Sequence, residues 1–306
     1  MPEGDTVRRA AARVHQALAG RTLDRAELRV PRFAAVDLTG RVVHSARSRG
    51  KHLFVVVGPD SRDTPGHDTP GRDTGDHDRG RAVLHAHLKM EGRVHVLRAG
   101  ERWRFPGHTA RLVLRAGDVE VVGTGLGLLR VLTPAEADAA VAHLGPDLLG
   151  DDRCWDAGTA EAVRRLGERP GRTIGEALLD QRNLAGIGTI YRAELCFLRG
   201  IDPRDPVSAV PDLPAVVDLA RRLLVANADR AVRVTTGDTR RGRELWVYGR
   251  DGKPCRRCGT PVETFRLGGR ADPAEPSDSP DRVAYICPSC QPRRATLGAN
   301  PTEEIT

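Results

Sequence analysis

No stretch of the 306-residue sequence stays apolar for long enough to cross a membrane. The N-terminal segment also lacks the apolar core of a secretory signal peptide, because Arg8, Arg9 and Arg13 interrupt it. Cysteine is scarce, with six residues, four of which fall into two C-x-x-C pairs. We therefore expect a cytoplasmic protein whose paired cysteines bind metal rather than form disulfides.

Positive charge is in modest excess, with 48 Lys and Arg against 41 Asp and Glu, a net charge of +7 and a pI of about 9.5. Such an excess favours an anionic partner, and nucleic acid is the commonest one. An arginine-rich surface adjusted only for solubility would give the same balance. Net charge alone leaves both interpretations open.

Hydrophobic spacing divides the chain into a β-rich first half and a helical second half. Residues 5–19 have helical spacing, with Asp5 or Thr6 as the N-cap and Gly20 as the stop. Several short strands after one helix indicate a β-sandwich or flattened barrel. The strand patterns cover residues 53–57, 82–88, 93–97, 110–114 and 119–122. The later helical patterns cover residues 134–144, 160–169, 174–180, 190–198 and 214–227.

These changes of pattern predict an α+β protein with two main domains and a C-terminal module. The expected parts are a β-sandwich with a flanking helix over 1–132, a helical domain over 133–243, a cysteine-rich module over 244–291 and a flexible tail over 292–306. Residues 58–81 contain no aliphatic or aromatic residue, and we expect a disordered insertion there. His67 and His77 lie in it among aspartates, but low-complexity repetition explains them better than a metal site does.

The first residues, MPEGDT, place a proline and a glutamate at positions 2 and 3. Removal of Met1 would leave Pro2 with a secondary amine, which can attack a sugar C1′ and form an iminium. The amine attacks only when it is neutral, and the positive end of the following helix and a nearby Lys51 would both disfavour its protonation. Glu3 offers a general acid or base for the proton transfers. Taken alone, such an N-terminus indicates little.

The longer segment MPEGDTVRRAA resembles the opening of the formamidopyrimidine-DNA glycosylase/endonuclease VIII family, in particular its endonuclease VIII-like branch. The resemblance implies that Pro2 is the Schiff-base nucleophile and Glu3 the proton donor. Lys51, in the segment SRGKHLF, matches the family's lysine on a β-hairpin, which assists β-elimination. Outside this resemblance, Lys51 would be interpreted as an ordinary exposed charge.

The segment HLKMEG, residues 87–92, is similar to a family loop that enters the duplex where the damaged base has been flipped out. Apolar side chains that separate base steps are a recurrent device, and Met90 is the candidate here. Lys89 stands where the endonuclease VIII branch has a polar residue that contacts DNA. A strand end with Met90 packed into the core is the alternative.

Residues 178–203, LLDQRNLAGIGTIYRAELCFLRGIDP, resemble the family's helix–two-turns–helix motif. Gly186 and Gly188 permit tight turns, and a helix should begin near Thr189, where its N-terminal N–H groups can receive a DNA phosphate. The family usually has asparagine at position 189. Threonine can cap a helix and donate one hydrogen bond, but it is shorter, so the strength of this contact stays open.

The strongest signal from the residues themselves lies near the end of the chain. Cys255-x-x-Cys258 and Cys287-x-x-Cys290 supply four thiolates for a tetrahedral zinc ion. The 28 residues between the pairs exceed the usual gap of about 15–20. Residues 271–281 have the composition of a flexible insertion, and without these 11 residues the gap is 17. We expect one structural zinc ion, with free or redox-active thiols as the alternative.

The segments VYGRDGKPCRRCG and RVAYICPSCQ, which contain these cysteines, resemble the family's zinc-finger hairpin. The resemblance implies that Arg282, five residues before Cys287, grips a phosphate and takes part in δ-elimination. Arg270 is the second candidate, because the insertion can displace the hairpin tip. Residues 240–257 carry seven basic and two acidic side chains, as a phosphate-facing strip would, although such a run is more often a solvated face.

Together the motifs imply a base-excision-repair DNA glycosylase with lyase activity on damaged double-stranded DNA. Pro2 attacks C1′, the base leaves, and β- and then δ-elimination cut the strand. The implied fold is a β-sandwich with a flanking helix, followed by a helix–two-turns–helix domain and a zinc-finger hairpin. We expect a monomer without membrane contact.

The lesion is less clear than the reaction. Residues 121–132, VVGTGLGLLRVL, lack the aromatic and arginine signature of the formamidopyrimidine branch. Oxidised pyrimidines and abasic sites are therefore favoured over oxidised purines. A catalytically silent damaged-DNA-binding protein on the same scaffold is a further alternative, but it would need neither Pro2 nor Glu3 nor Lys51.

Overall fold

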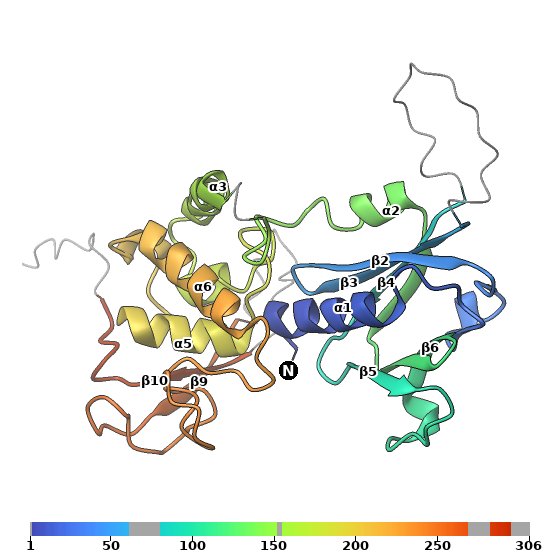
Figure 1. Cartoon of the computed structure of the whole chain (residues 1–306). Coiled ribbons are helices and arrows are strands. Elements are labelled where there is room, and N and C mark those ends of the chain that lie inside the picture. Colours follow the sequence, from blue (N-terminus) through green and yellow to red (C-terminus); the bar gives the residue numbers. More distant parts are fainter. Residues whose placement is uncertain (1, 61–79, 152–154, 269–281, 295–306) are drawn as a thin grey trace, which may run out of the picture. The chain divides into compact units, whose positions relative to one another are not determined.

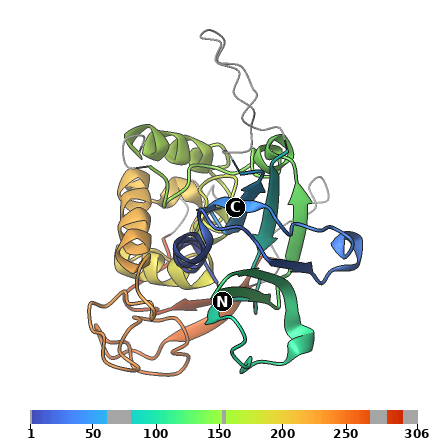
Figure 2. The same ribbon diagram turned by 45° about the vertical axis from the view of Figure 1, so that its right-hand side comes forward.

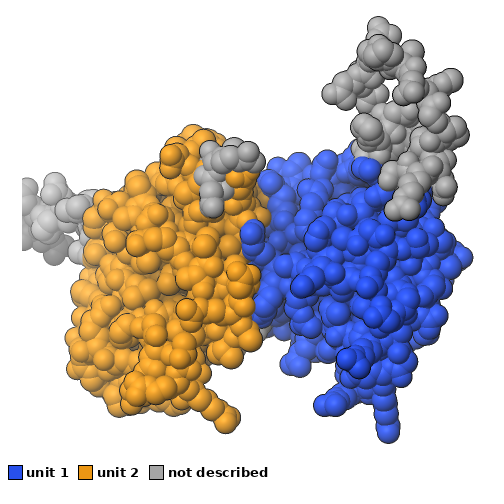
Figure 3. Space-filling view, in the orientation of Figure 1, with its two compact units in different colours: residues 1–143 blue, residues 144–306 orange. Residues whose placement is uncertain are grey.

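The computed structural model describes residues 2–60, 80–151, 155–268 and 282–294 (Figure 1). The chain divides into two compact units, residues 1–143 and 144–306 (Figure 3). The division lies after residue 143 rather than after 132, because helix α2 (Pro134–Ala139) packs against strands of the first unit. In the described ranges no helix is both long and apolar enough to span a membrane.

Two antiparallel four-stranded sheets build the first unit, as the strand patterns predicted. In one, the strands follow the order β1 (Arg25–Leu28), β6 (Ala110–Ala116), β7 (Val119–Thr124) and β5 (Arg93–Arg98). In the other, the order is β2 (Val42–Arg49), β3 (His52–Gly58), β4 (Ala82–His87) and β8 (Leu128–Leu132). Strands β1, β2 and β8 are absent from the prediction, since β1 is only four residues long and arginines interrupt the apolar alternation of all three. Short 3₁₀ turns cover Pro31–Phe33 and Gly107–Thr109.

Helix α1 (Gly4–Leu18) joins both sheets in one hydrophobic core (Figure 1, Figure 2). Val7, Val14 and Leu18 lie on its buried face at helical spacing. The helix begins one residue earlier than expected, and the predicted cap at Asp5 or Thr6 is wrong. Glu3 is the N-cap residue, although its side chain makes no capping hydrogen bond.

The described part of the second unit contains four helices, α3 (Trp155–Gly167), α4 (Ile174–Ala177), α5 (Thr189–Arg199) and α6 (Leu213–Asn227), and a 3₁₀ turn at Val207–Ala209. Helix α6 packs against α3 and α5, and these contacts enclose a core rich in leucine and isoleucine. The expected helices at 134–144 and 174–180 end earlier, at residues 139 and 177, whereas the one expected at 160–169 begins at residue 155.

Strands β9 (Glu263–Leu267) and β10 (Arg282–Ile286) form an antiparallel hairpin, and β10 packs against α5. A small second core joins α5 to the hairpin. In it, Phe197 of α5 packs with Val247, Val262 and two of the paired cysteines. The hairpin is therefore attached to the helix that follows the predicted phosphate-binding turn. Most of the 58–81 segment, all of 271–281, Cys154, Arg270 and the chain end beyond residue 294 lie outside the described residues.

Candidate active site and metal centre

Pro2 and Glu3 lie directly before the N-terminal end of α1. The backbone carbonyl of Glu3 accepts a hydrogen bond from the N–H of Val7 at 3.1 Å, which closes the first turn. The Glu3 side chain is fully buried, whereas Pro2 is half-buried. Because the N-terminal end of a helix carries partial positive charge, it lowers the proton affinity of an amine placed there.

Lys51 lies in the two-residue turn between β2 and β3, where Arg49 pairs with His52 across the hairpin. Gly50 occupies the first central position with φ of +55°, a region that favours glycine and is typical of a type II′ turn. The Lys51 side chain is half-buried. Burial, Lys89 and Lys51 together lower the pKa of His87 to about 4, so the Lys51 charge lies near that imidazole.

The HLKMEG segment forms a tight loop after β4. Lys89 is the one non-glycine residue with positive φ in the described ranges, at +52°, and its N–H donates to Nδ1 of His87 at 2.9 Å. Its side chain lies over Gly127, where an added Cβ would come within 2.1 Å of Lys89 Cγ. Met90 is 61% exposed and therefore does not belong to the core.

The turn before α5 contains the two glycines of the predicted phosphate clamp. Gly186 has φ of +114°, and Gly188, which is in extended conformation, is the N-cap residue of α5. Thr189 is thus the first helical residue, close to where the helix was expected to begin, and Gly188 rather than Thr189 is the N-cap residue. Its side chain is nevertheless near the N-terminal end, where backbone N–H groups favour an anion.

Gln181, which sequence reasoning missed, holds this turn in place. Its Nε2 donates to the carbonyls of Leu179 and Ile187 at 2.8 and 2.9 Å, and its Oε1 accepts from the N–H of Gly186 at 3.0 Å. One amide side chain therefore connects Leu179, shortly after α4, with the loop that leads into α5. A turn restrained in this way is pre-organised for a ligand.

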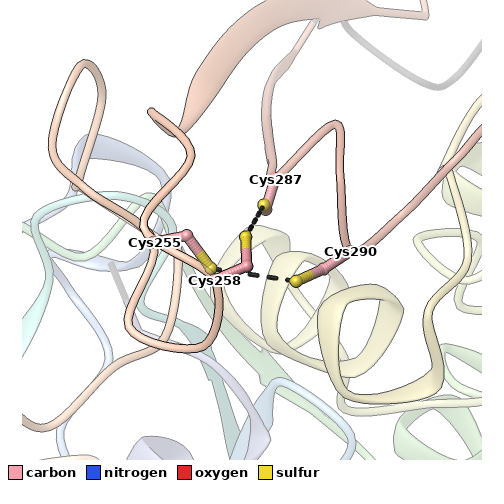
Figure 4. Close-up of side chains that lie close together, drawn as sticks. All are labelled: Cys255, Cys258, Cys287 and Cys290. Carbon is pink, nitrogen blue, oxygen red and sulfur yellow. Dashed lines mark hydrogen bonds between the residues drawn. The ribbon is translucent and has the colours of Figure 1, made fainter.

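The four paired cysteines converge, as predicted (Figure 4). Their Sγ atoms all lie within 4.8 Å of one another, with Cys255 and Cys290 4.0 Å apart and Cys258 and Cys287 3.4 Å apart. Four thiolates bound at about 2.3 Å to a tetrahedral ion would be roughly 3.8 Å apart. The residues therefore fit a single ion of this kind.

The surrounding backbone supports this arrangement. Oε1 of Gln291 accepts from the N–H of Cys287 at 2.9 Å, and its Nε2 donates to the carbonyl of Ile201 at 2.8 Å. Cys255 donates its N–H to the carbonyl of Thr260 at 2.8 Å. Hydrogen bonds within the protein therefore also stabilise the turns that carry both cysteine pairs.

Arg282 is the first residue of β10 and pairs with Leu267 across the hairpin. Its side chain is half-buried. In the basic 240–257 segment, Arg250 and Arg256 donate to backbone carbonyls, and the Arg257 guanidinium lies 4.4 Å from the ring centroid of Phe197. Several of these arginines therefore make contacts within the fold, so the segment is not entirely a solvated face.

Comparison with known proteins identifies the family to which the chain belongs. The model of the formamidopyrimidine-DNA glycosylase N-terminal domain matches residues 1–123. A Streptomyces coelicolor protein named probable endonuclease 8 2 is 47% identical over 294 residues, which cover 95% of this chain and 94% of that protein. The chain belongs to the formamidopyrimidine-DNA glycosylase/endonuclease VIII family. It falls in the endonuclease VIII-like branch.

Further relatives agree with this assignment. A Mycolicibacterium smegmatis protein named DNA-(apurinic or apyrimidinic site) lyase Nei2 is 45% identical, with 95% of this chain and 99% of that protein covered. Lactococcus lactis Fpg, solved in complex with DNA containing an abasic site, has a TM-score of 0.70 at 19% identity over 95% of this chain and all of that chain. The predicted fold and the predicted enzyme class, a bifunctional DNA glycosylase and lyase, are confirmed.

A cluster of three histidines beside Lys51 was not anticipated. His52, His85 and His87 lie on the face of the β2-β3-β4-β8 sheet opposite to the core, with His52 Nδ1 2.8 Å from His85 Nε2. Burial and neighbouring positive charge lower the pKa of His52 to about 3 and of the other two to about 4. The cluster is neutral at pH 7 and adds no charge to that of Lys51. The alternation LHAHL was the available sequence signal.

Glu194, also missed, links α5 to the segment before the cysteine hairpin. Its fully buried carboxylate accepts hydrogen bonds from the consecutive N–H groups of Trp246, Val247 and Tyr248 at 2.7, 3.0 and 2.9 Å. The Thr235 hydroxyl also donates to it. All four donors to this carboxylate are more than 40 residues away in sequence, so no local pattern indicates its role.

Proposed function

We propose that this chain removes oxidised bases from double-stranded DNA, pyrimidines preferentially, and cuts the strand at the resulting abasic site, with Pro2 as the nucleophile. The relationship to endonuclease 8 and lyase proteins over 95% of the chain carries the proposal. The placement of Pro2 and buried Glu3 at the positive end of α1 supports it. The reaction requires removal of Met1, because only then is the Pro2 nitrogen a secondary amine.

In the proposed reaction the neutral Pro2 amine forms a bond to C1′ of the damaged nucleotide. The bond from C1′ to the base breaks, and the base leaves with the proton that the Pro2 nitrogen releases. The sugar ring then opens to an iminium as O4′ takes a proton from Glu3. Glu3 is fully buried, and Pro2 beside it is half-buried. Its position next to Pro2 in sequence holds donor and nucleophile together.

Elimination follows from the iminium. Loss of the C2′ proton breaks the bond from C3′ to its phosphate, and a second elimination breaks the bond from C5′ to its phosphate. Lys51, held in the β2–β3 turn, is the proposed assistant of the first elimination. Arg282, on β10, is the proposed phosphate ligand at the second.

The remaining predicted residues are proposed to hold the DNA. Exposed Met90 would fill the space left by the flipped base, with Lys89 beside it as a polar contact. Gly186, Gly188 and Thr189 would form the phosphate clamp at the N-terminal end of α5. Arg270, the second candidate for the hairpin contact, lies outside the described residues.

Zinc is the metal that fits the four-cysteine centre, because tetrahedral thiolate sites of closed geometry are typical of structural zinc. Cys255, Cys258, Cys287 and Cys290 would each supply one thiolate. No position would remain open for water, so the ion would stabilise the hairpin and take no part in the reaction. Equimolar zinc in metal analysis of the purified protein would support this assignment.

Borohydride trapping tests the nucleophile. The protein with Met1 removed should form a covalent adduct with a duplex containing an abasic site, because borohydride reduces the iminium to a stable amine. Pro2→Gly leaves a primary amine at a position with altered backbone freedom and should abolish most of the adduct. Absence of any adduct from correctly processed, zinc-loaded protein would overturn the proposal. A panel of duplexes with one oxidised base each then tests the preference for pyrimidines.

A further inference from the structure

A strongly basic cavity lies in the second unit, and none of its lining residues has a role in the proposed reaction. It has a volume of about 220 Å³ and lies between the end of α3, the 168–172 loop and the segment that follows α4. Five arginines line it: Arg164, Arg165, Arg169, Arg172 and Arg182. Glu168 and Asp180 are the acidic lining residues, so positive charge exceeds negative by three among the lining side chains.

Ion pairs orient four of the five arginines. Asp180 accepts from Arg182 through two nitrogens, at 3.0 and 2.9 Å, and from Nη1 of Arg172 at 2.8 Å. Burial raises the pKa of Asp180, but the hydrogen bonds from both arginines outweigh it and lower that pKa to about 2. Asp180 therefore stays ionised at neutral pH, and the two guanidinium groups keep their positions.

Glu161, which is not a lining residue, holds the other side of the cavity. It accepts from Arg164 at 2.8 Å and from Arg165 at 2.6 Å, and Arg165 also donates to the carbonyl of Arg182 at 2.7 Å. Even with Glu161 counted, the five arginines exceed the carboxylates by two. Each guanidinium has five N–H donors, more than the two that it uses in a bidentate pair with one carboxylate.

The excess of guanidinium groups indicates the chemistry of the ligand. Arginine in a rigid arrangement matches the oxygen atoms of phosphate, which accept several N–H donors at once. Because the carboxylates have already oriented the side chains, a ligand would lose little further rotamer entropy on binding. A carboxylate ligand would satisfy fewer of these donors than a phosphate.

The cavity is also connected to the turn before α5. Asp180 and Asn183 line it, and Gln181 between them donates to the carbonyl of Ile187 and accepts from the N–H of Gly186. Cavity wall and turn are therefore parts of one hydrogen-bonded loop. A DNA strand presents a phosphate about every 3.4 Å of helix axis, so a duplex held at one phosphate offers further phosphates to neighbouring basic surface.

We propose that this arginine-lined cavity binds a phosphate group, either from the backbone of the bound duplex outside the lesion or from a free phosphate-bearing small molecule. The DNA source rests on the proposed function, whereas the free-phosphate source does not. No residue of the cavity takes part in the proposed glycosylase or lyase steps.

Two cavity variants and one control test the proposal. Arg182→Ala and Arg169→Ala each remove one exposed lining charge, so neither should disturb the core. Arg222→Ala is the matched control, because Arg222 on α6 is exposed, pairs with one aspartate and does not line the cavity. In the first arm, fluorescence anisotropy measures the affinity for a duplex with a stable abasic-site analogue across a potassium chloride series. In the second arm, calorimetry titrates the DNA-free protein with inorganic phosphate.

If the cavity holds a backbone phosphate, each cavity variant should lower the salt slope by about one. The loss of affinity between about 50 and 200 mM salt then shrinks three- to fourfold relative to the wild type, whereas Arg222→Ala keeps the wild-type slope. If the ligand is free phosphate, the salt slopes of duplex binding in the cavity variants equal that of the wild type. The wild type then binds phosphate, and the cavity variants bind it at least fivefold more weakly.

Wild-type slopes in the cavity variants, together with no phosphate binding that depends on Arg182 or Arg169, would overturn the proposal. A wild-type protein that does not bind the duplex at all would instead contradict the proposed function. The phosphate titration would still test the cavity in that case, so the two failures are distinguishable.

Discussion

Replacing Glu194 with glutamine tests how the cysteine hairpin is attached to α5. The two side chains have nearly the same shape, so the change removes charge and one acceptor without opening a cavity. In the wild type, Oε1 accepts from Val247 and Tyr248, and Oε2 accepts from Trp246 and Thr235. An amide offers only one oxygen, and its NH₂ group would face N–H donors.

The magnitude follows from these four bonds. A hydrogen bond to a charged group contributes about 1.5–3 kcal/mol, and a buried donor left without an acceptor costs about 1–3 kcal/mol. The Thr235 hydroxyl can rotate to accept from the new NH₂, but the N–H of Trp246 cannot. Losing the Trp246 bond and weakening the two to the remaining oxygen should therefore lower the free energy of unfolding by roughly 2–4 kcal/mol.

Urea unfolding, followed by tryptophan fluorescence, measures this change directly, since Trp246 lies in the affected segment. Glu263→Gln is the control, because Glu263 is exposed on β9 and its replacement should change the free energy by less than about 0.5 kcal/mol. The looser hairpin should also lose its metal to a chelator faster. A Glu194→Gln protein as stable as the control would refute the reasoning that these amides depend on the carboxylate.

Three further predictions concern the hairpin, the histidine cluster and the metal. Arg282→Ala should weaken duplex binding and lower its salt slope by about one, and unchanged binding would move this role elsewhere on the hairpin. The pKa values of His52, His85 and His87 lie below their ordinary value, so the unfolded chain binds more protons than the folded one between about pH 4 and 6.5. Stability should therefore be complete above about pH 6.5 and fall as pH decreases through that window, less steeply in His85→Gln, as thermal melts at several pH values would reveal. Removing the metal with a chelator should unfold the hairpin and abolish duplex binding, while circular dichroism should still show the strands of the first unit.

The general fold could be predicted because its signals are local. Aliphatic residues alternate along β3, β4 and β6, and α1 repeats them at helical spacing, so burial itself produces the pattern. Strand β2 escaped prediction because His44, Arg47 and Arg49 interrupt its apolar face. The cysteine centre was predictable for a similar reason, since each C-x-x-C pair forms half of the site within a single turn.

The side chains that hold the site in place by hydrogen bonds could not be predicted, because most of them bond to residues distant in sequence. Glu194 meets its three amide partners 52 to 54 residues later, and Gln291 reaches back 90 residues to Ile201. A single glutamate or glutamine in a helix or tail has no spacing that marks such a role. Gln181 is local, but its function depends on the conformation of Gly186, which the sequence indicates only as a turn.

Thr189 is the position where this chain departs from the expected motif, and it permits a sharp test of the clamp. Its side chain is at the first position of α5, and no hydrogen bond of its hydroxyl is found within the described residues. Thr189→Val keeps the shape and removes only the hydroxyl. The free energy of unfolding should therefore stay within about 0.5 kcal/mol of wild type. A lost bond to a charged DNA phosphate should instead cost about 1.5–3 kcal/mol of binding, a Kd at least roughly tenfold weaker.

Parallel measurements of unfolding and of duplex affinity separate these two effects. Lower affinity at unchanged stability would identify the hydroxyl as a phosphate ligand despite its short reach. Unchanged affinity would mean that the backbone N–H groups at the end of α5 hold the phosphate alone, since the turn fixed by Gln181 presents them in either variant. The departure from asparagine would then be tolerated because the clamp is made by the main chain.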